Sequence, residues 1–340
     1  MSPNNRFLTD AKLPPMHGDL RSLARILTVA AALLPALTGA QETYPARPVR
    51  FIVPFPAATP PDLLARIAAQ KLTESWGTPV IVEVRDGASG TIGVNQVVRS
   101  APDGYTLLFT NDIPIVIAPA VSKTAYDPRK DLAPIGAVAQ GVSVLVVHPS
   151  LGVGSINELI AVARTRPGAL TFASSGQAST SHMCAELIKR AAGIDLLGVP
   201  YKGAAPAIQA VLTGDVSMYC SPAFQALPHL KSGKLKALGT TGTRPSSVIP
   251  DVMPISAQGL PDVLASNWYA AFAHSNTPTA ILDKIRDSLK RAFDDDDVRQ
   301  RLAGVGLDPI WMDASALTAT IRSDLEKWAR VAQKAGIRTE

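Results

Sequence analysis

Residues 49–72 read VRFIVPFPAATPPDLLARIAAQKL, and the fold prediction starts from this stretch. Residues 50–53 are rich in β-branched and aromatic side chains, which predicts a strand. After a Pro-rich loop, apolar residues repeat at helical spacing from Leu64 to Leu72, behind Pro61 at the start of the pattern. The stretch therefore predicts a strand, a loop and a helix in succession.

The same order continues along the chain. Residues 80–84 predict a second strand, a short helix ends near Ala101, and residues 106–110 form an apolar run without charge. Such a run suits a parallel strand that is buried on both faces. The succession of strands and helices predicts a mainly parallel sheet with helices on both sides.

A second lobe is predicted where this rhythm breaks. Residues 134–139 and 142–147 are two apolar strands joined through Gly141 with no helix between them. Alternation then resumes with a helix that opens at the capping box of Ser155 and Glu158. We therefore expect an α/β protein of two comparable lobes with a cleft between them. Their predicted extents are residues 41–139 with 246–340 for lobe 1, and 140–245 for lobe 2.

The N-terminal residues predict export. Arg21 and Arg25 precede an uncharged apolar run at residues 26–37, and the small residues 38–40 follow it. This is the pattern of a cleaved secretory signal peptide over residues 1–40, with an uncleaved membrane anchor as the alternative. The same pattern predicts that the mature chain lies in an oxidising compartment outside the cytoplasm.

Two cysteines remain in the exported part. Cys184 and Cys220 both have apolar neighbours in sequence. In an oxidising compartment they either form a disulfide or stay as two buried free thiols, and the sequence leaves both readings open.

Composition argues against several classes of function. The 33 Lys and Arg side chains exceed the 28 Asp and Glu by a net charge of only +5, and no window holds a dense basic stripe for nucleic acid. The two Cys and five His side chains show no zinc spacing, and phosphate-cradling glycine loops and a nucleophile elbow are missing from the sequence. We therefore expect neither a metal nor a cofactor. His182 alone among the histidines lies in a hydroxyl-rich loop, where we expect its neutral ring to bond a carbonyl.

The loops that follow the predicted strands are small and rich in hydroxyl groups. In open α/β sheets, ligands gather outside the carboxyl ends of the strands. Several of these loops, including residues 174–181, run directly into helix N-termini, where free N–H groups and the helix dipole favour an anion. The alternative is that these Ser and Thr side chains only cap their helices. Their recurrence after successive strands favours a carboxylate cleft.

The mature chain resembles the tripartite tricarboxylate transporter receptor family, the Bug-type solute-binding proteins. The resemblance covers nearly all of residues 44–336. The segments that carry it are Tyr44–Phe55, Asp62 with Ala65–Arg66, Gly87–Gly90, Ala101–Leu108, Ala173–Gly176 with Ser181–His182, Val199–Ala207 and Leu227–His229.

The resemblance implies a two-lobed periplasmic binding protein fold of type II-like topology that closes on a small carboxylate. The ligand would be a mono-, di- or tricarboxylate, with aromatic acids among the candidates. It also implies a monomer without enzymatic activity that delivers its ligand to a membrane transporter with one small and one large multi-span subunit. Two rivals are a sensor component that presents the same ligand to a receptor, and an extracytoplasmic enzyme with Ser181 as nucleophile and His182 as base.

The ligand contacts that the resemblance implies can be assigned position by position. They are Phe55, Ala57, Ala58, Thr59, Thr110, Asn111, Ser174, Ser175, Gly176, Thr180, Ser181, Tyr201, Lys202, Gly203 and Ser221. Lys202 is the cation of this set, and it either pairs with a distal carboxylate or stays solvated at the rim.

The sequence departs from the family at three places in this set and beside it. Ala58 and Thr59 replace glycines, which limits left-handed backbone conformations. Pro61 replaces a frequent Thr and removes one N–H donor. Ser221 stands where many relatives place an Asp that would meet a ligand amine, so its presence argues against an amino acid ligand.

Overall fold

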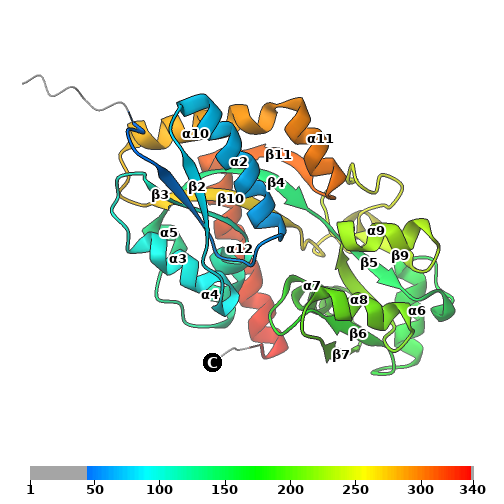
Figure 1. Cartoon of the computed structure of the whole chain (residues 1–340). Helices are drawn as coiled ribbons and strands as arrows, with labels where there is room; N and C mark the ends of the chain where they lie inside the picture. Colours follow the sequence, from blue (N-terminus) through cyan, green and yellow to red (C-terminus); the bar gives the residue numbers. More distant parts are fainter. Residues whose placement is uncertain (1–43, 338–340) are drawn as a thin grey trace, which may run out of the picture. The chain divides into compact units, whose positions relative to one another are not determined.

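Two β-sheets with flanking helices organise the chain in the computed structural model, which describes residues 44–337 (Figure 1). The chain from Tyr44 onward clusters as one compact unit. The predicted signal peptide at residues 1–40 lies outside the described residues. Within residues 44–337, no helix combines the length and apolar composition needed to cross a bilayer.

The first sheet has six strands in the order β11-β4-β10-β3-β1-β2. They are β1 (Val49–Val53), β2 (Val80–Val84), β3 (Thr106–Asn111), β4 (Leu132–Gly141), β10 (Asn267–His274) and β11 (Asp308–Met312). Strand β1 pairs in parallel with β2 and β3, as the strand–helix alternation predicts. Strand β10 runs antiparallel to both β3 and β4, and β11 runs antiparallel to β4.

Alternating side chains of these strands fill two different cores. Phe51 and Leu107 point into one with α2 (Pro60–Trp76), α10 (Thr279–Asp294) and α11 (Asp296–Gly304). Ile52 and Leu108 point into the other, which contains residues of α3 (Thr91–Val98) and α12 (Ala314–Ala335). This two-residue period explains why the central strand β3 lacks charge, since both of its faces are covered. The short helices α4 (Ala118–Val121) and α5 (Pro128–Asp131) complete this part.

The second sheet has five strands in the order β7-β6-β8-β5-β9. They are β5 (Ser143–Val147), β6 (Thr171–Ser174), β7 (Leu197–Pro200), β8 (Met218–Pro222) and β9 (Lys236–Thr240). Strand β6 is parallel to β7 and β8, whereas β5 is antiparallel to β8 and β9. The helices of this part are α6 (Ile156–Thr165), α7 (Thr180–Ala192), α8 (Ala204–Leu212) and α9 (Ala223–Lys231).

Both sheets are therefore mixed, whereas the sequence led us to expect mainly parallel ones. The cause lies in the crossings between the sheets. Strand β4 passes into β5 through Val142 alone, and β10 enters the first sheet from the second instead of through a crossover helix. Without a crossover helix, the returning strand lies antiparallel to its neighbours.

The acidic run Asp294–Asp297 separates two helices. Helix α10 ends at Asp294, and Asp295 caps α11 by accepting hydrogen bonds from the N–H groups of Asp297 and Val298. Lys71 Nζ lies 2.7 Å from Asp295 Oδ2 and lowers the pKa of that carboxyl. The helix α11 and the strand β11 after it are additions to the predicted fold.

The crossings between the sheets are tied together by Thr241. Its Oγ1 lies 3.0 Å from the N–H of Ser143, which donates to it, and 3.2 Å from the carbonyl of Ala265. Thr241 is fully buried, and its backbone N–H donates to Ser143 O. These hydrogen bonds of Thr241 thus hold the segments of the chain together where it leaves the second sheet.

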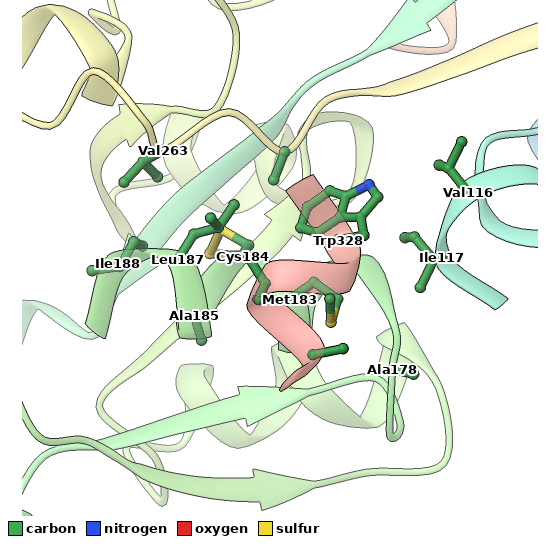
Figure 2. Close-up of a cluster of buried hydrophobic side chains, with 14 of the residues drawn as sticks. Val116, Ile117, Ala178, Met183, Cys184, Ala185, Leu187, Ile188, Val263 and Trp328 are labelled. Carbon is green, nitrogen blue, oxygen red and sulfur yellow. A yellow bond between two sulfur atoms is a disulfide. The ribbon is translucent and has the colours of Figure 1, made fainter. Parts of the chain in front are cut away.

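One hydrophobic core extends from the first sheet to α7. Trp328 of α12 lies between Ile117, from the segment after β3, and Met183 of α7 (Figure 2). Each of the three is at most 1% exposed. Because tightly packed interiors resist displacement, this contact restrains the position of α7 relative to the first sheet.

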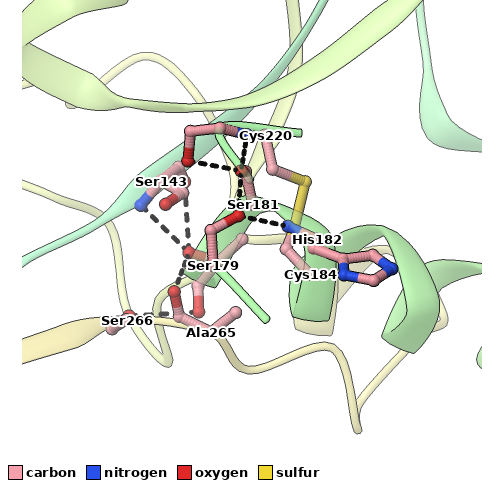
Figure 3. Close-up of a disulfide and its surroundings, with 10 residues drawn as sticks. Ser143, Ser179, Ser181, His182, Cys184, Cys220, Ala265 and Ser266 are labelled. Atoms are coloured by element: carbon pink, nitrogen blue, oxygen red, sulfur yellow. Dashed lines mark hydrogen bonds between the residues drawn. A yellow bond between two sulfur atoms is a disulfide. The ribbon is translucent and has the colours of Figure 1, made fainter. Parts of the chain in front are cut away.

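Cys184 of α7 and Cys220 of β8 form a disulfide, which decides between the two readings of the sequence (Figure 3). The bridge ties the first half of α7 to the strand beside β6. A bridge between residues 36 apart restricts the unfolded chain substantially.

We predict that replacing both cysteines by alanine lowers the free energy of unfolding by about 2–4 kcal/mol, measured by urea denaturation. The control is the same measurement with a reductant, which should lower the stability of the wild-type protein and leave the double variant unchanged. Two reactive thiols in the unreduced, denatured wild-type protein would contradict the bridge.

Candidate functional site

A cavity of about 200 Å³ lies between residues of the two sheets. It is smaller than the roughly 300–1,000 Å³ of drug-sized pockets, so it suits a small ligand. Its polar lining residues are Asn111, Ser143, Ser175, Ser179, Thr180, Ser181, Tyr219, Asn267 and Tyr269. Its other lining residues are Pro60, Ile113, Gly141, Val142, Cys220, Pro222, Ala223, Phe224, Gly306 and Leu307. None of these lining residues carries a formal charge.

A cluster of serine hydroxyls occupies the loop between β6 and α7 (Figure 3). Ser181 Oγ accepts from the N–H of Ser175 at 2.9 Å and lies 3.0 Å from Ser175 Oγ and 2.9 Å from Ser179 Oγ. Ser179 is the N-cap of α7 and accepts from the N–H of His182. Small hydroxyl residues are common at this position because they satisfy first-turn N–H groups.

The first turn of α7 also keeps two backbone donors. Met183 N–H donates to Ser179 O, and His182 N–H donates to Ser179 Oγ. The N–H groups of Thr180 and Ser181, at the first two helical positions, have no acceptor within the helix. Together with the positive end of the helix dipole, these donors favour a negative charge in the cavity that both residues line.

Tyr219 lines the same cavity and has a buried hydroxyl group. The residue is 1% exposed, and its Oη makes no hydrogen bond within the described part of the chain. Burial raises the pKa of Tyr219 to about 12, although the nearby hydroxyls of Ser175 and Ser181 oppose the rise. The phenol therefore stays neutral and can donate to a ligand. A buried polar group without a partner costs about 1–3 kcal/mol, and an acceptor on a ligand would remove that cost.

Asn267 connects the first sheet to the N-terminus of α7. Its Nδ2 donates to Asp112 Oδ1 at 2.8 Å and to Thr180 Oγ1 at 3.0 Å. An amide nitrogen has two hydrogens, so both are used in this bridge. The Asn267 bridge, meaning these two hydrogen bonds, holds Thr180 against the end of β3.

Asp112 is almost completely buried behind this bridge, with 1% of its surface exposed. Burial and then the negative charge of Asp324 raise the pKa of Asp112 to about 7. The hydrogen bond from Asn267 and the charge of Lys327 oppose this rise. A carboxylate therefore sits directly behind an uncharged cavity.

The structure places four of the predicted contact residues on the cavity: Asn111, Ser175, Thr180 and Ser181. Thr110, Ser174 and Ser221 are buried at the ends of their strands, outside the lining. Tyr201 N–H donates to Ser174 O, so Tyr201 lies beside the end of β6. Lys202 and Gly203 follow it in the chain, and Gly176 lies close to the carbonyl of Tyr201. Lys202 is exposed.

The loop of Phe55, Ala57, Ala58 and Thr59 precedes α2, and its neighbour Pro60 is the residue that lines the cavity. Ala57 and Ala58 are exposed. Ala58 has a φ of 63°, so this alanine adopts a left-handed conformation that favours glycine.

The ring of His182 has a different hydrogen-bond partner from the one that the sequence predicted. Its Nδ1 accepts from the N–H of Ala178 at 3.1 Å, whereas a carbonyl was expected as the partner. Burial lowers the pKa of His182, in agreement with a neutral ring. The Ser181 hydroxyl contacts Ser175 and Ser179, so the described residues do not join it to His182 as a nucleophile and base.

Sequence reasoning missed Tyr219, Asn267 and Tyr269. Each lies inside an apolar strand, where the pattern predicts burial without chemistry. Asn267 offered one signal, since it is a polar residue at the start of the apolar strand β10. Tyr219 offered none, because a tyrosine in a strand is ordinarily packing.

Comparison with known proteins identifies relatives of this chain. The family model described as Tripartite tricarboxylate transporter family receptor matches residues 64–337. Protein BugT of Bordetella pertussis is 33% identical over 297 residues, which are 87% of this chain and 91% of BugT.

Two solved structures with bound acids resemble the fold. R. palustris Rpa4515 with adipate is 29% identical with a TM-score of 0.73, and the match covers 87% of this chain and 99% of that one. MatC from Rhodopseudomonas palustris with bound malate is 29% identical with a TM-score of 0.70, covering 85% and 99%. This likeness confirms the predicted two-lobed binding protein fold.

We predict that Ala58→Gly raises the free energy of unfolding by about 1 kcal/mol or less, because glycine relieves the left-handed strain. The matched control is Ala57→Gly, whose φ is not positive and which should lower stability by roughly 0.5–1 kcal/mol. Urea denaturation measures both. Equal losses in the two variants would show that position 58 carries no strain.

A pH dependence follows from Asp112. Its pKa is raised from 3.8 to about 7 in the folded protein, so the folded state holds a proton that the unfolded chain has lost in this window. Stability should therefore fall as pH rises from about 4 to 7, by a few kcal/mol at most. Asp112→Asn keeps an acceptor for Asn267 and removes the titration.

The measurement is the difference in free energy of unfolding between wild type and Asp112→Asn at pH 4.5 and pH 8. The free energy of unfolding of Asp112→Asn, relative to that of the wild type, should be higher at pH 8 than at pH 4.5. Replacing the exposed Asp251 by Asn is the matched control. A difference that is the same at both pH values would refute the raised pKa.

Proposed function

Since the chain belongs to the tripartite tricarboxylate transporter receptor family, we propose that it is a periplasmic solute-binding protein that captures a small organic carboxylate between its lobes. The lobes would follow the boundaries predicted from sequence. The observation that carries the proposal is the uncharged cavity, which is lined by Thr180 and Ser181 of the first turn of α7 and by Tyr219.

Hydrogen bonds can hold the anion in this arrangement. A bond from a neutral donor to an ionised acceptor contributes about 1.5–3 kcal/mol. The N–H groups of Thr180 and Ser181 with the hydroxyl of Tyr219 make three such donors. Micromolar affinity corresponds to about 8 kcal/mol, so three or four bonds of this strength account for it.

The relatives support the chemical class of the ligand. Adipate and malate, the acids bound to the two similar structures, are both small organic carboxylates. Of the residues predicted from the resemblance, we propose direct contacts for Asn111, Ser175, Thr180 and Ser181. Tyr219 is our addition to that set.

The proposed partner is a membrane transporter with one small and one large multi-span subunit, to which the protein would deliver its ligand as a monomer. A sensor role would use the same cavity and a different partner. The enzyme alternative lacks support from the site, because His182 Nδ1 is occupied by the N–H of Ala178.

The test is a thermal-shift screen of hexanoate, adipate, benzoate and malate, followed by calorimetry of the acids that raise the melting temperature. We expect at least one acid to stabilise the protein and bind without chemical change. Tyr219→Phe should weaken the binding of that acid by about tenfold or more, because the variant loses the buried hydroxyl.

Tyr105→Phe is the matched control. The Tyr105 hydroxyl accepts from the N–H of Ala46 and does not line the cavity, so ligand affinity should stay at the wild-type value. If none of the four acids shifts the melting temperature, the carboxylate assignment fails. Turnover of a bound acid would favour the enzyme alternative instead.

A further inference from the structure

We propose that this cavity selects a monocarboxylate with an apolar body over the corresponding dicarboxylate. The inference rests on the proposed function and narrows the class of ligand that the site takes. It stands on three features of the cavity: where its donors lie, what covers the rest of its wall, and which charges are close to it.

Most donors for an anion gather around the N-terminus of α7, and Asn111 and Tyr269 of the first sheet also line the cavity. Thr180 and Ser181 contribute backbone N–H groups, and the Tyr219 hydroxyl lies close to Ser181. Asn267 cannot add a donor, because its two amide hydrogens are bonded to Asp112 and Thr180. One carboxylate is enough to use the donors of this end.

Apolar side chains make up much of the remaining wall. Ile113 and Leu307 come from the first sheet's part of the chain, and Val142 and Phe224 from the crossing and from α9. Leu307 and Val142 are buried, whereas Phe224 is 38% exposed. A hydrocarbon or aromatic body gains by contact with such a surface, about 25 cal/mol for each Å² removed from water.

The charges near the cavity disfavour a second carboxylate. No lining residue is a cation, and Lys202, the basic residue that the sequence offered, is exposed and outside the lining. The buried carboxyl of Asp112 is bonded to the Asn267 amide that lines the cavity. A second ligand carboxylate would lose its hydration without gaining a cationic partner.

The test compares acids that share one carbon skeleton. Hexanoate is paired with adipate, and benzoate with isophthalate, each titrated calorimetrically into the full mature protein at pH 8 and fixed ionic strength. In each pair that binds, the monoacid should have a dissociation constant at least about tenfold lower than the diacid. A diacid that binds as tightly as its monoacid, or more tightly, overturns the inference and leaves the proposed carboxylate-binding function standing.

A second arm adds the missing cation. Phe224 lines the cavity and is 38% exposed, so Phe224→Arg can place a guanidinium at the wall without burying it. We expect this variant to improve diacid affinity and to close the gap between the acids of a pair. Phe224→Gln is the matched neutral control and should leave the ratio as in the wild type.

The outcomes separate the two claims. If neither acid of either pair binds, the proposed function fails and the selectivity fails with it. Only the selectivity fails if the acids bind, the diacid has the same dissociation constant as the monoacid in the wild type, and Phe224→Arg leaves the ratio of the two dissociation constants unchanged. A wild-type preference for monoacids that Phe224→Arg removes and Phe224→Gln keeps would support both.

Discussion

A binding site that holds an anion without a cation depends on the N-terminus of α7 staying in one place. Backbone N–H groups act over a hydrogen-bond distance, so a small displacement of the helix removes their effect. Three contacts from different directions fix it. The Asn267 bridge reaches it from the first sheet, the Cys184–Cys220 disulfide ties it to β8, and Trp328 packs against it from α12.

The buried acid behind the site has a structural role that explains its position. Asp112 accepts one hydrogen of the Asn267 amide, and this leaves the second hydrogen directed at Thr180. The same acid faces Asp324 and Lys327 of α12, and Trp268 Nε1 donates to Asp324 Oδ2. A negative charge on Asp112 therefore changes the electrostatic potential both at the cavity and at α12, the helix that packs on α7.

The sequence predicted every strand except β11 and most of the helices, because burial imposes periods of two and 3.6 residues. It did not predict how strands pair, since an apolar strand such as β10 has the same pattern whether its neighbours run parallel or antiparallel. It also missed α11, because Asp295 reads as the end of a helix although it caps the next one. Short-range signals thus define elements, and the crossings between the sheets decide topology.

The candidate site divides in the same way. The hydroxyl loop of Ser175 to Ser181 was predictable, because strand ends and helix caps carry local signals. Tyr219 and Asn267 were not predictable. The role of a polar side chain on a strand depends on which residues of the other sheet lie opposite it, and a local sequence pattern does not show those residues. Both lie on strands, and neither lies in a loop that varies freely.

This placement bears on how such a site changes its ligand. Loop residues such as Ala58 can change with small effects on the fold, because they are exposed. Strand residues are held by pairing on both sides, as Tyr219 is between β5 and β6, and therefore present their polar atoms at fixed positions. A donor at a fixed position in a small cavity rejects ligands that do not match it, because the mismatch leaves a buried polar group unpaired. We therefore expect the strands, more than the loops, to set which acid is accepted.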